Sequence, residues 1–281
     1  MKTITYSLLF SLCLSLFSCA FNMDYPEKIK GEGEVITEQI VLDSFKDLEL
    51  KRGWEVTLQP ASSNYMVVEA NENLFEVLEH ENISGKLVIG SSKQIASADA
   101  KQITLYFTEK LESLKVSSGT EVSSPERLNF DNLILDLSSG CEVTLDLDLR
   151  SLDLETSSGS EANLILKLDD LFVDSSSGSS ADIEVNAIST KVESSSGSDV
   201  FLKGSSGQLE VRTSSGSSVN SKALESEKVT AKASSGSSIS VYPLEDLEAE
   251  TSSGGNVYYY NKPLGSLDLN KSKSGGVIKL K

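Results

Sequence analysis

The tripeptide Ser-Ser-Gly recurs along the C-terminal half of the chain at a nearly fixed interval. Successive glycines are separated by 21, 19, 19, 19, 19, 20, 18 and 21 residues, and the last belongs to a degenerate Lys-Ser-Gly. A period near 19 is too short for two packed helices. It fits one coil of a β-solenoid, in which each coil buries its apolar side chains against its neighbours. The glycines are Gly119, Gly140, Gly159, Gly178, Gly197, Gly216, Gly236, Gly254 and Gly275.

Apolar or small residues occupy every second position of each period, as in strands with one solvated face. Around Gly159, for example, Leu152 and Leu154 keep this phase and polar residues stand between them. If the alternation continues through the tripeptide, the second serine, Ser158, points inward together with Ser160. Inward serines would then bond to one another or to carbonyl groups of neighbouring coils.

This assignment carries a test. A leucine at the inward position Ser158 is expected to overpack the core and destabilise the protein by roughly 1–3 kcal/mol. A leucine at Ser157, one residue away and outward, is expected to be nearly neutral.

Three local features stand out from the repeat. Cys141 replaces the serine after glycine and is expected to be a small buried side chain without a reactive role. The extra Gly-Ser-Ser-Gly at Gly204–Gly207 predicts a small local loop. A cluster of lysines near the C-terminus predicts a charged cap over the last coil.

These patterns predict an all-β, single-domain parallel β-solenoid, or β-helix, which we expect to be right-handed. It would contain about nine coils of ~19 residues. The predicted organisation is a signal peptide or lipobox at residues 1–19, a tether at 20–34, a β-rich capping head at 35–115 and the Ser-Ser-Gly solenoid with its C-terminal cap at 116–281. Within the head, Asn71 to Glu79 is predicted as a short helix with an asparagine N-cap.

The first residues have the features of an export signal. Lys2 precedes the apolar stretch Thr5 to Phe17, which is too short to span a bilayer stably. Leu16 to Cys19 resembles a lipobox, so Cys19 is the predicted site of lipid attachment. Ordinary cleavage after Ala20 is the alternative. The predicted location is the cell envelope, as an outer-membrane-anchored lipoprotein facing the periplasm or the cell surface, with the membrane as a partner through the lipid.

The charge of the chain restricts its partners. Without residues 1–18 the chain has 24 basic and 42 acidic residues, a formal net charge of −18. A surface this acidic repels nucleic acid and anionic membranes, so no nucleic-acid partner is expected. Only one cysteine, Cys141, lies beyond the signal region, which excludes an intrachain disulfide framework.

The residues of a catalytic site are missing from the sequence. The single histidine, His80, falls at the end of the predicted helix, and none of the many serines has a histidine in its own repeat. No phosphate-binding loop and no Cys/His zinc cluster is present, so no cofactor or metal is expected. The acid pairs Asp146/Asp148 and Asp169/Asp170 are interpreted as a solvated face, and the chain is predicted not to be an enzyme.

Two segments before the repeats resemble a known family. The first is the run Leu48 to Leu58 around a central glycine, and the second is the run Asn71 to Ile89; repeated short strands with Ser-Gly corners follow them. The chain is similar to exported bacterial proteins described as auto-transporter adhesins with a head GIN domain, over most of residues 40–281. Gly53-Trp54-Glu55 stands where the family has Gly-Ile-Asn. The resemblance implies an all-β solenoid at the cell envelope with an adhesin-like role and no catalytic residues.

The best candidates for a ligand face are rows of outward side chains that repeat every ~4.8 Å. Such a lattice matches a repeating polymer, and aromatic rings stack on sugars. A glycan or an envelope or extracellular protein is therefore the expected partner. The candidate residues are Ser138, Ser157, Ser176, Ser195, Ser214, Tyr258 and Tyr260.

The resulting hypothesis is a non-enzymatic envelope lipoprotein that acts as an adhesin-like or polymer-binding module. A periplasmic structural scaffold is the alternative. A polysaccharide-active β-helix enzyme is a more remote one, because the strict period leaves no room for the long loops that build a catalytic cleft.

Overall fold

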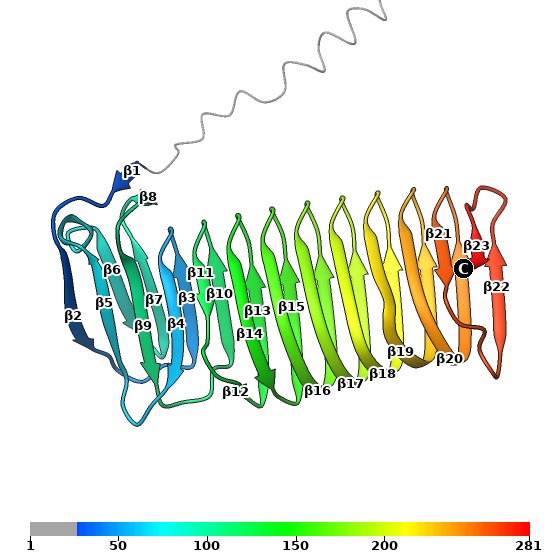
Figure 1. The fold of residues 1–281 in the computed structure, drawn as a ribbon, viewed down its shortest axis with the longest axis horizontal. Helices are drawn as coiled ribbons and strands as arrows, with labels where there is room; N and C mark the ends of the chain where they lie inside the picture. The colour runs from blue at the N-terminus through cyan, green and yellow to red at the C-terminus, as the bar shows by residue number, and fades with distance from the viewer. Residues whose placement is uncertain (1–26) are drawn as a thin grey trace, which may run out of the picture.

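The computed structural model describes residues 27–281, which form 23 strands and one short 3₁₀-helix. Figure 1 shows a straight rod of stacked coils whose tight turns line up along one side. The predicted all-β parallel solenoid with about nine turns and ~19-residue spacing is confirmed. The predicted signal peptide, Cys19 and the first part of the tether lie outside the described residues.

Each coil has two walls, which meet at the Ser-Ser-Gly turn. The pre-turn wall contains the strands that lead into the turns, and the post-turn wall contains those that leave them. The pre-turn wall is built from β3 (Asp47–Lys51), β10 (Ser113–Ser117), β13 (Asn132–Leu137), β15 (Ser151–Thr156) and β22 (Leu267–Lys271). The post-turn wall is built from β4 (Glu55–Pro60), β11 (Glu121–Ser123), β12 (Leu128–Asn129), β14 (Glu142–Asp148), β21 (Asn256–Tyr259) and β23 (Ile278–Leu280).

Five long strands in the middle of the rod belong to both walls. Each leaves one turn, follows the post-turn wall, bends at the wide corner opposite the turns and returns along the pre-turn wall (Figure 1). They are β16 (Glu161–Ser175), β17 (Ser180–Ser194), β18 (Asp199–Thr213), β19 (Ser218–Ala233) and β20 (Ser238–Thr251).

At the N-terminal end the order in space differs from the order in sequence. Strands β7 (Lys86–Ser91) and β9 (Lys101–Phe107) pair with β3 and β4 on the side away from β10 and β11. The coil of β3 and β4 therefore lies between two coils that follow it in the chain. Antiparallel strands close this end: β2 (Val35–Val41), β5 (Tyr65–Asn71) and β6 (Leu78–Ile83). A small parallel pair joins β1 (Lys28–Lys30) to β8 (Gln94–Ser97).

The helix predicted from Asn71 to Glu79 is wrong. The structure has a single 3₁₀ turn, η1 (Glu72–Leu74), and β6 begins at Leu78. The Asn71 side chain makes no cap. Instead its Oδ1 accepts hydrogen bonds from the backbone of Asp99 and Ala100, at 2.9 and 3.3 Å, and its Nδ2 donates to Gly33 O at 3.1 Å. The asparagine thus ties three segments of the end together.

The Ser-Ser-Gly unit is a tight turn with two residues in the left-handed region. In the coil around Gly159, Ser158 has φ 53° and Gly159 has φ 71°, and Ser160 N donates to Ser157 O at 3.1 Å. Two consecutive positive φ angles are the mark of a type I′ turn. The second serine therefore lies at the exposed tip, and the predicted inward position of Ser158 is wrong.

The residue after glycine does point inward, as predicted. Ser198 Oγ donates to Ser175 O of the preceding coil at 2.7 Å and to Ser195 O of its own turn at 2.9 Å. Ser217 repeats the pattern on Ser194 and Ser214. This row of serines satisfies buried carbonyl groups and fastens each turn to the coil before it.

Cys141 occupies the same position as these serines and is buried. Its thiol donates to Val116 O at 3.2 Å, and burial raises the pKa of the thiol to about 11. The thiol therefore stays protonated, which agrees with a packing role.

The exposed turn position gives a stability prediction of its own. Ser158→Asn should leave the free energy of unfolding within about 0.5 kcal/mol, because asparagine tolerates positive φ, whereas Ser158→Val should cost about 1–2 kcal/mol through backbone strain. Urea unfolding of the two variants measures the difference. Equal losses in both variants would contradict the turn geometry.

The loop predicted at Gly204–Gly207 is also wrong. These residues lie inside β18, where it passes the wide corner, and Ser206 is buried. Ser206 Oγ donates to Thr190 Oγ1 of the preceding coil at 3.0 Å. Glycine is needed here because the backbone of β18 approaches the backbone of the preceding coil closely. A Cβ at Gly204 would stand 2.2 Å from Val185 O.

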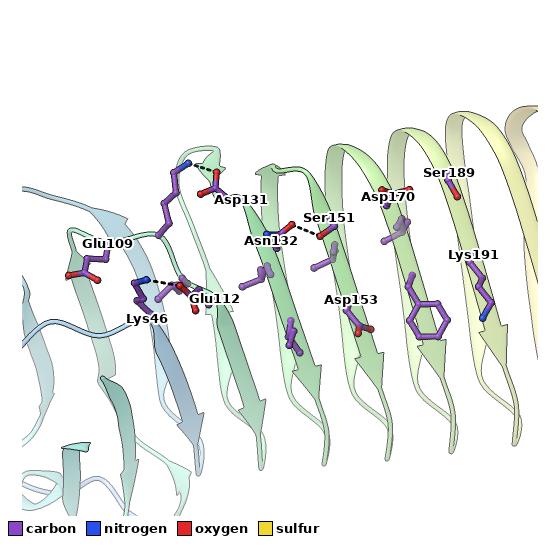
Figure 2. Close-up of a pocket in the computed structure, with 17 residues that line it drawn as sticks. Lys46, Glu109, Glu112, Asp131, Asn132, Ser151, Asp153, Asp170, Ser189 and Lys191 are labelled. Carbon is purple, nitrogen blue, oxygen red and sulfur yellow. Dashed lines mark hydrogen bonds and ion pairs between the residues drawn. The ribbon is translucent and has the colours of Figure 1, made fainter. Parts of the chain in front are cut away.

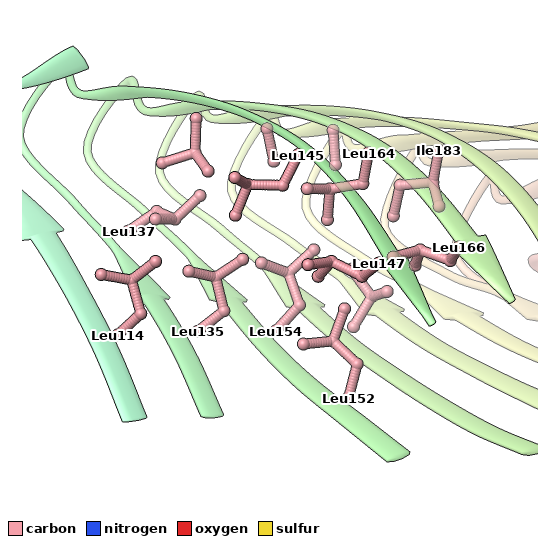
Figure 3. Close-up of a cluster of buried hydrophobic side chains, with 14 of the residues drawn as sticks. Leu114, Leu135, Leu137, Leu145, Leu147, Leu152, Leu154, Leu164, Leu166 and Ile183 are labelled. Carbon is pink, nitrogen blue, oxygen red and sulfur yellow. The ribbon is translucent and has the colours of Figure 1, made fainter. Parts of the chain in front are cut away.

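The core consists of rows of aliphatic side chains that run along the rod between the two walls. Leu114, Leu135 and Leu154 stack in register on the pre-turn wall. Leu164 and Ile183 continue a facing row on the post-turn wall (Figure 3). Because each row is continuous, the outward side chains between them also form straight rows on the two outer faces.

Candidate functional site

A long groove crosses the outer face of the pre-turn wall near the wide corner (Figure 2). Its volume is about 1060 Å³, and it reaches from Lys46, just before β3, to Lys191 on β17. From β10 to β17 it crosses five successive strands, a span of roughly 20 Å at the usual strand spacing. We call it the pre-turn groove.

One row of the pre-turn groove contains two apolar side chains at positions that face solvent. Parallel pairing places Ile134, Asp153, Phe172 and Lys191 one behind the other. Ile134 is 53% exposed, and Phe172 is half-buried. Lys191 Nζ stands 4.8 Å from the centre of the Phe172 ring, a cation–π contact. The row therefore offers an aliphatic and an aromatic surface between charged groups.

A second row of the groove, two residues earlier along each strand, is polar. It consists of Asn132, Ser151, Asp170 and Ser189 in register. Ser151 Oγ donates to Asn132 Oδ1 at 2.7 Å, and Figure 2 shows these side chains above the apolar row. Amide, hydroxyl and carboxylate groups thus line one edge of the groove at regular spacing.

Two ion pairs close the N-terminal end of the groove. Lys46 Nζ lies 2.6 Å from Glu112 Oε1, and Lys110 Nζ lies 2.8 Å from Asp131 Oδ1. The hydrogen bond that Lys110 donates lowers the pKa of the Asp131 carboxyl, and the hydrogen bond that Lys46 donates to Glu112 raises the pKa of Lys46. Both pairs are exposed and contribute little to stability, but they shape the end of the groove.

The structure places the serines of the predicted ligand face beside the turns rather than in the pre-turn groove. All five are the first residue of a turn and are half-buried: Ser138, Ser157, Ser176, Ser195 and Ser214. Ser195 and Ser214 line a smaller groove of about 430 Å³ together with Glu193, Arg212 and Lys232. Burial, together with neighbouring carboxylates, raises the pKa of Asp174 at its margin.

The predicted tyrosines lie on the opposite wall. Tyr258 is on β21 of the post-turn wall, with Lys281 Nζ 4.8 Å from its ring centre, and Tyr260 follows β21 and is 37% exposed. Tyr259 between them is buried. The structure therefore does not bring the tyrosines and the serine row together into one face.

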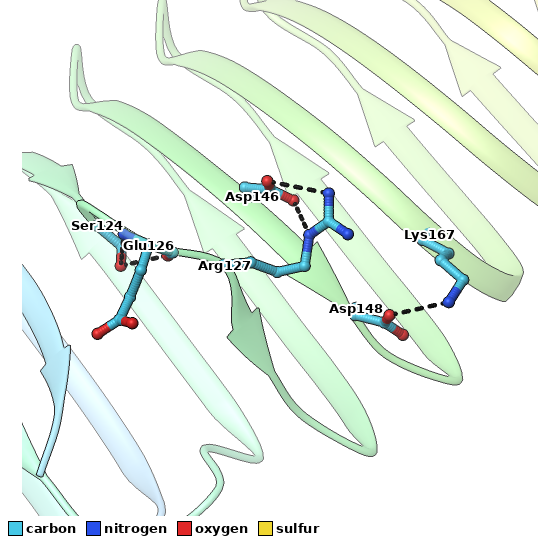
Figure 4. Close-up of polar contacts among 6 residues, drawn as sticks. All are labelled: Ser124, Glu126, Arg127, Asp146, Asp148 and Lys167. Carbon is cyan, nitrogen blue, oxygen red and sulfur yellow. Dashed lines mark hydrogen bonds and ion pairs between the residues drawn. The ribbon is translucent and has the colours of Figure 1, made fainter.

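The acid pair Asp146/Asp148 is neutralised on the post-turn wall (Figure 4). Arg127 makes two hydrogen bonds to Asp146, at 2.7 and 3.1 Å, and Lys167 Nζ lies 3.1 Å from Asp148. Each carboxylate has its own cation, which is typical of a solvated face.

No histidine lies near the groove. His80, the single histidine, is exposed on β6 at the N-terminal end, opposite Ile89 of β7. Among residues 27–281 no group of three or more His, Cys, Asp or Glu side chains is placed to hold a metal ion. In the same part of the chain no helix is long and apolar enough to cross a membrane.

The family model described as "Putative auto-transporter adhesin, head GIN domain" matches residues 44–184 and 165–263. The chain belongs to this family. Among proteins with curated descriptions, none matches the chain.

Several solved structures share the fold of this chain. A putative adhesin from Parabacteroides distasonis ATCC 8503 has a TM-score of 0.66 at 14% identity, and one from Parabacteroides merdae ATCC 43184 has 0.63 at 17% identity. A putative lipid binding protein from Parabacteroides distasonis has 0.60 at 17% identity. Each match covers 91% of this chain and 100% of the other.

The pre-turn groove is not among the sites predicted from the sequence. The available signal was the presence of Ile134 and Phe172 at outward positions, where the alternation calls for polar residues. They are 38 residues apart, which is two periods, so strand pairing leaves only Asp153 between them.

Proposed function

We propose that this chain is a non-enzymatic, adhesin-like protein of the cell envelope that binds an extended glycan in the pre-turn groove. The observation that carries the proposal is the row containing Ile134 and Phe172, with a parallel polar row beside it. An aromatic face flanked by hydroxyl, amide and carboxylate groups suits a chain of sugar rings, whose apolar faces stack while their hydroxyls form hydrogen bonds.

The dimensions of the pre-turn groove support a glycan chain, rather than a single sugar, as the ligand. The groove crosses five strands with the same side-chain spacing, so a linear polymer makes repeated contacts while a single sugar fills only a part. The membership in an adhesin family agrees with surface interaction. Attachment to the outer membrane through a lipid on Cys19, with the rod facing the periplasm or the cell surface, is part of the same proposal.

The groove is tested by Phe172→Ala, with Phe201→Ala as the matched control. Phe201 is an exposed aromatic residue on the post-turn wall, 44% accessible, and does not line the groove. We expect Phe172→Ala to weaken binding to a panel of linear polysaccharides by about tenfold or more, given roughly 1–3 kcal/mol for a stacked aromatic ring. Phe201→Ala should bind as the unchanged protein does. Isothermal titration calorimetry gives the affinities.

Two results would overturn the groove assignment. One is equal loss of binding in the two variants, and the other is the absence of binding to every polysaccharide tested. In the second case the periplasmic scaffold becomes the better hypothesis.

The anchoring is tested separately by Cys19→Ala and labelling with a fatty-acid analogue. Incorporation of label into the unchanged chain and its loss in Cys19→Ala supports lipid attachment. An unlabelled chain that begins after Ala20 would support ordinary cleavage instead.

A further inference from the structure

The two ends of the rod carry opposite charge. At the N-terminal end, the segments 31–45 and 72–85 contain eight acidic residues and neither lysine nor arginine. All eight are exposed: Glu32, Glu34, Glu38, Asp43, Glu72, Glu76, Glu79 and Glu81. None of them takes part in an ion pair among the described residues.

The C-terminal end is basic in a protein that is otherwise strongly acidic. Residues 260–281 contain five lysines and a single acid, Asp268. The lysines are Lys262, Lys271, Lys273, Lys279 and Lys281, and all are exposed. Within the described part of the chain, none of them lies within ion-pair distance of a carboxylate of this molecule.

The apolar core continues into the C-terminal end without being covered. Buried Leu247 is followed in its row by Leu267, which is 43% exposed, and buried Tyr259 is followed by Leu280, which is 44% exposed. The lysines that we predicted as a cap surround this apolar surface but do not close it. An apolar surface with a polar rim is typical of a protein interface.

Among residues 27–281, each end of the rod has an unpaired strand edge on both walls. On the post-turn wall, within the part of the chain that the structure describes, β2 pairs only with β5 and β23 only with β21. On the pre-turn wall, β6 pairs only with β7 and β22 only with β20 among the described strands. At the N-terminal end the post-turn wall is one strand longer than the pre-turn wall, because β5 and β2 follow β9 whereas only β6 follows β7. A second copy placed end to end would therefore bring β23 against β2, and β22 would face β6 across a step of one strand.

The strand directions also allow this continuation. β2 is antiparallel to β5, and β5 is antiparallel to β9, which runs parallel to β4. It follows that β2 has the same direction as the post-turn wall, and a stacked β23 would extend that wall with parallel pairing. β6 is antiparallel to its wall and lies one strand further back than β2, so the proposed backbone pairing between two copies rests on β23 and β2.

We propose that copies of this chain associate head to tail, the basic C-terminal end of one rod docking on the acidic N-terminal end of the next. Like ends repel one another, since acids would face acids and lysines would face lysines. Unlike ends attract and also cover the exposed leucines. Such a contact joins two different surfaces, so it does not close on itself and extends into a filament of rods.

The test uses two triple charge reversals in the full chain, kept in a mild detergent so that the N-terminal residues are treated alike in all samples. One variant is Glu38→Lys, Glu79→Lys, Glu81→Lys at the acidic end. The other is Lys271→Glu, Lys279→Glu, Lys281→Glu at the basic end. Analytical ultracentrifugation reports the sedimenting species at low and high salt.

We expect the unchanged chain to form larger species with rising concentration at low salt and fewer at high salt, because salt screens the attraction. Each triple variant alone should remain a single rod. An equimolar mixture of the two should associate again, since each then offers the end that the other needs. This recovery also shows that both variants are folded.

A control reverses three exposed lysines in the middle of the rod: Lys203→Glu, Lys222→Glu and Lys228→Glu. It changes the net charge by the same amount as the basic-end variant and should associate like the unchanged chain. The proposal is overturned if the unchanged chain stays a single rod at all concentrations, if the mid-rod variant loses association equally, or if the mixture does not recover it.

Discussion

Gly204→Ala is expected to destabilise the protein by about 3 kcal/mol or more. Gly204 has φ 114°, and its ideal Cβ would stand 2.2 Å from Val185 O and 3.1 Å from Val185 C on the preceding coil. Backbone atoms inside a parallel ladder cannot move aside without breaking pairing along both neighbours. The energetic cost of the positive φ angle and the cost of the steric clash with Val185 therefore add.

The matched control is Gly159→Ala. Gly159 also has a positive φ, 71°, but no atom lies within 4 Å of its ideal Cβ, because it sits at the tip of a turn. This variant should lose only about 1 kcal/mol, the cost of an alanine in the left-handed region. The midpoint of urea unfolding for the two variants gives the comparison. Equal midpoints would mean that the close approach at the wide corner is not present in solution.

A deletion of half a coil is expected to abolish the folded rod, whereas deletion of a whole coil is expected to preserve it. Removing residues 180–198 joins Ser179 to Asp199, and both Ser179 and Ser198 occupy the position after the turn glycine. In the shortened chain β18 takes the place of β17 beside β16, because β16 pairs with β17 in the same register as β17 pairs with β18. The shortened chain should remain soluble, rich in strand and cooperative in unfolding.

Removing residues 180–189 instead places Thr190 directly after the turn. A segment of the pre-turn wall then follows where the post-turn wall is required, and no register buries both apolar rows. The lost burial of about five side chains is on the order of 10 kcal/mol, more than a typical domain can lose. Circular dichroism and size-exclusion chromatography distinguish the outcomes. A well-folded half-coil deletion would show that coils do not depend on their register.

The fold could be predicted because its two periods, two residues and about 19 residues, are both written in the sequence. Leu152 and Leu154 mark the inward phase, and Gly159 marks the turn. The same regularity caused the error at Ser158. Thr156 and Ser160, the buried residues on either side of the turn, are four positions apart. Because four is an even number, the alternation of inward and outward residues has the same phase before and after the turn, and the turn leaves no mark in the pattern.

Other features depend on contacts that are distant in sequence. Asn71 is a plausible helix cap by residue type, but its amide is engaged by Gly33, Asp99 and Ala100. The glycines at 204 and 207 resemble a loop until the neighbouring coil is placed against them. The pre-turn groove is an intermediate case. Ile134 and Phe172 are visible in the sequence as exceptions to the alternation, but the polar row beside them follows only from the register of the paired strands.

The interleaving of the first coils determines the order in which the molecule is able to form. Residues 47–60 lie between the strands of residues 86–107 and those of residues 113–123, so the first coil has no finished neighbour until a much later part of the chain is available. This start has a high contact order and is expected to limit the folding rate. Every later coil pairs with a coil that is already formed and that lies only one period away in the sequence. These coils are therefore expected to fold rapidly once the slow first step is complete.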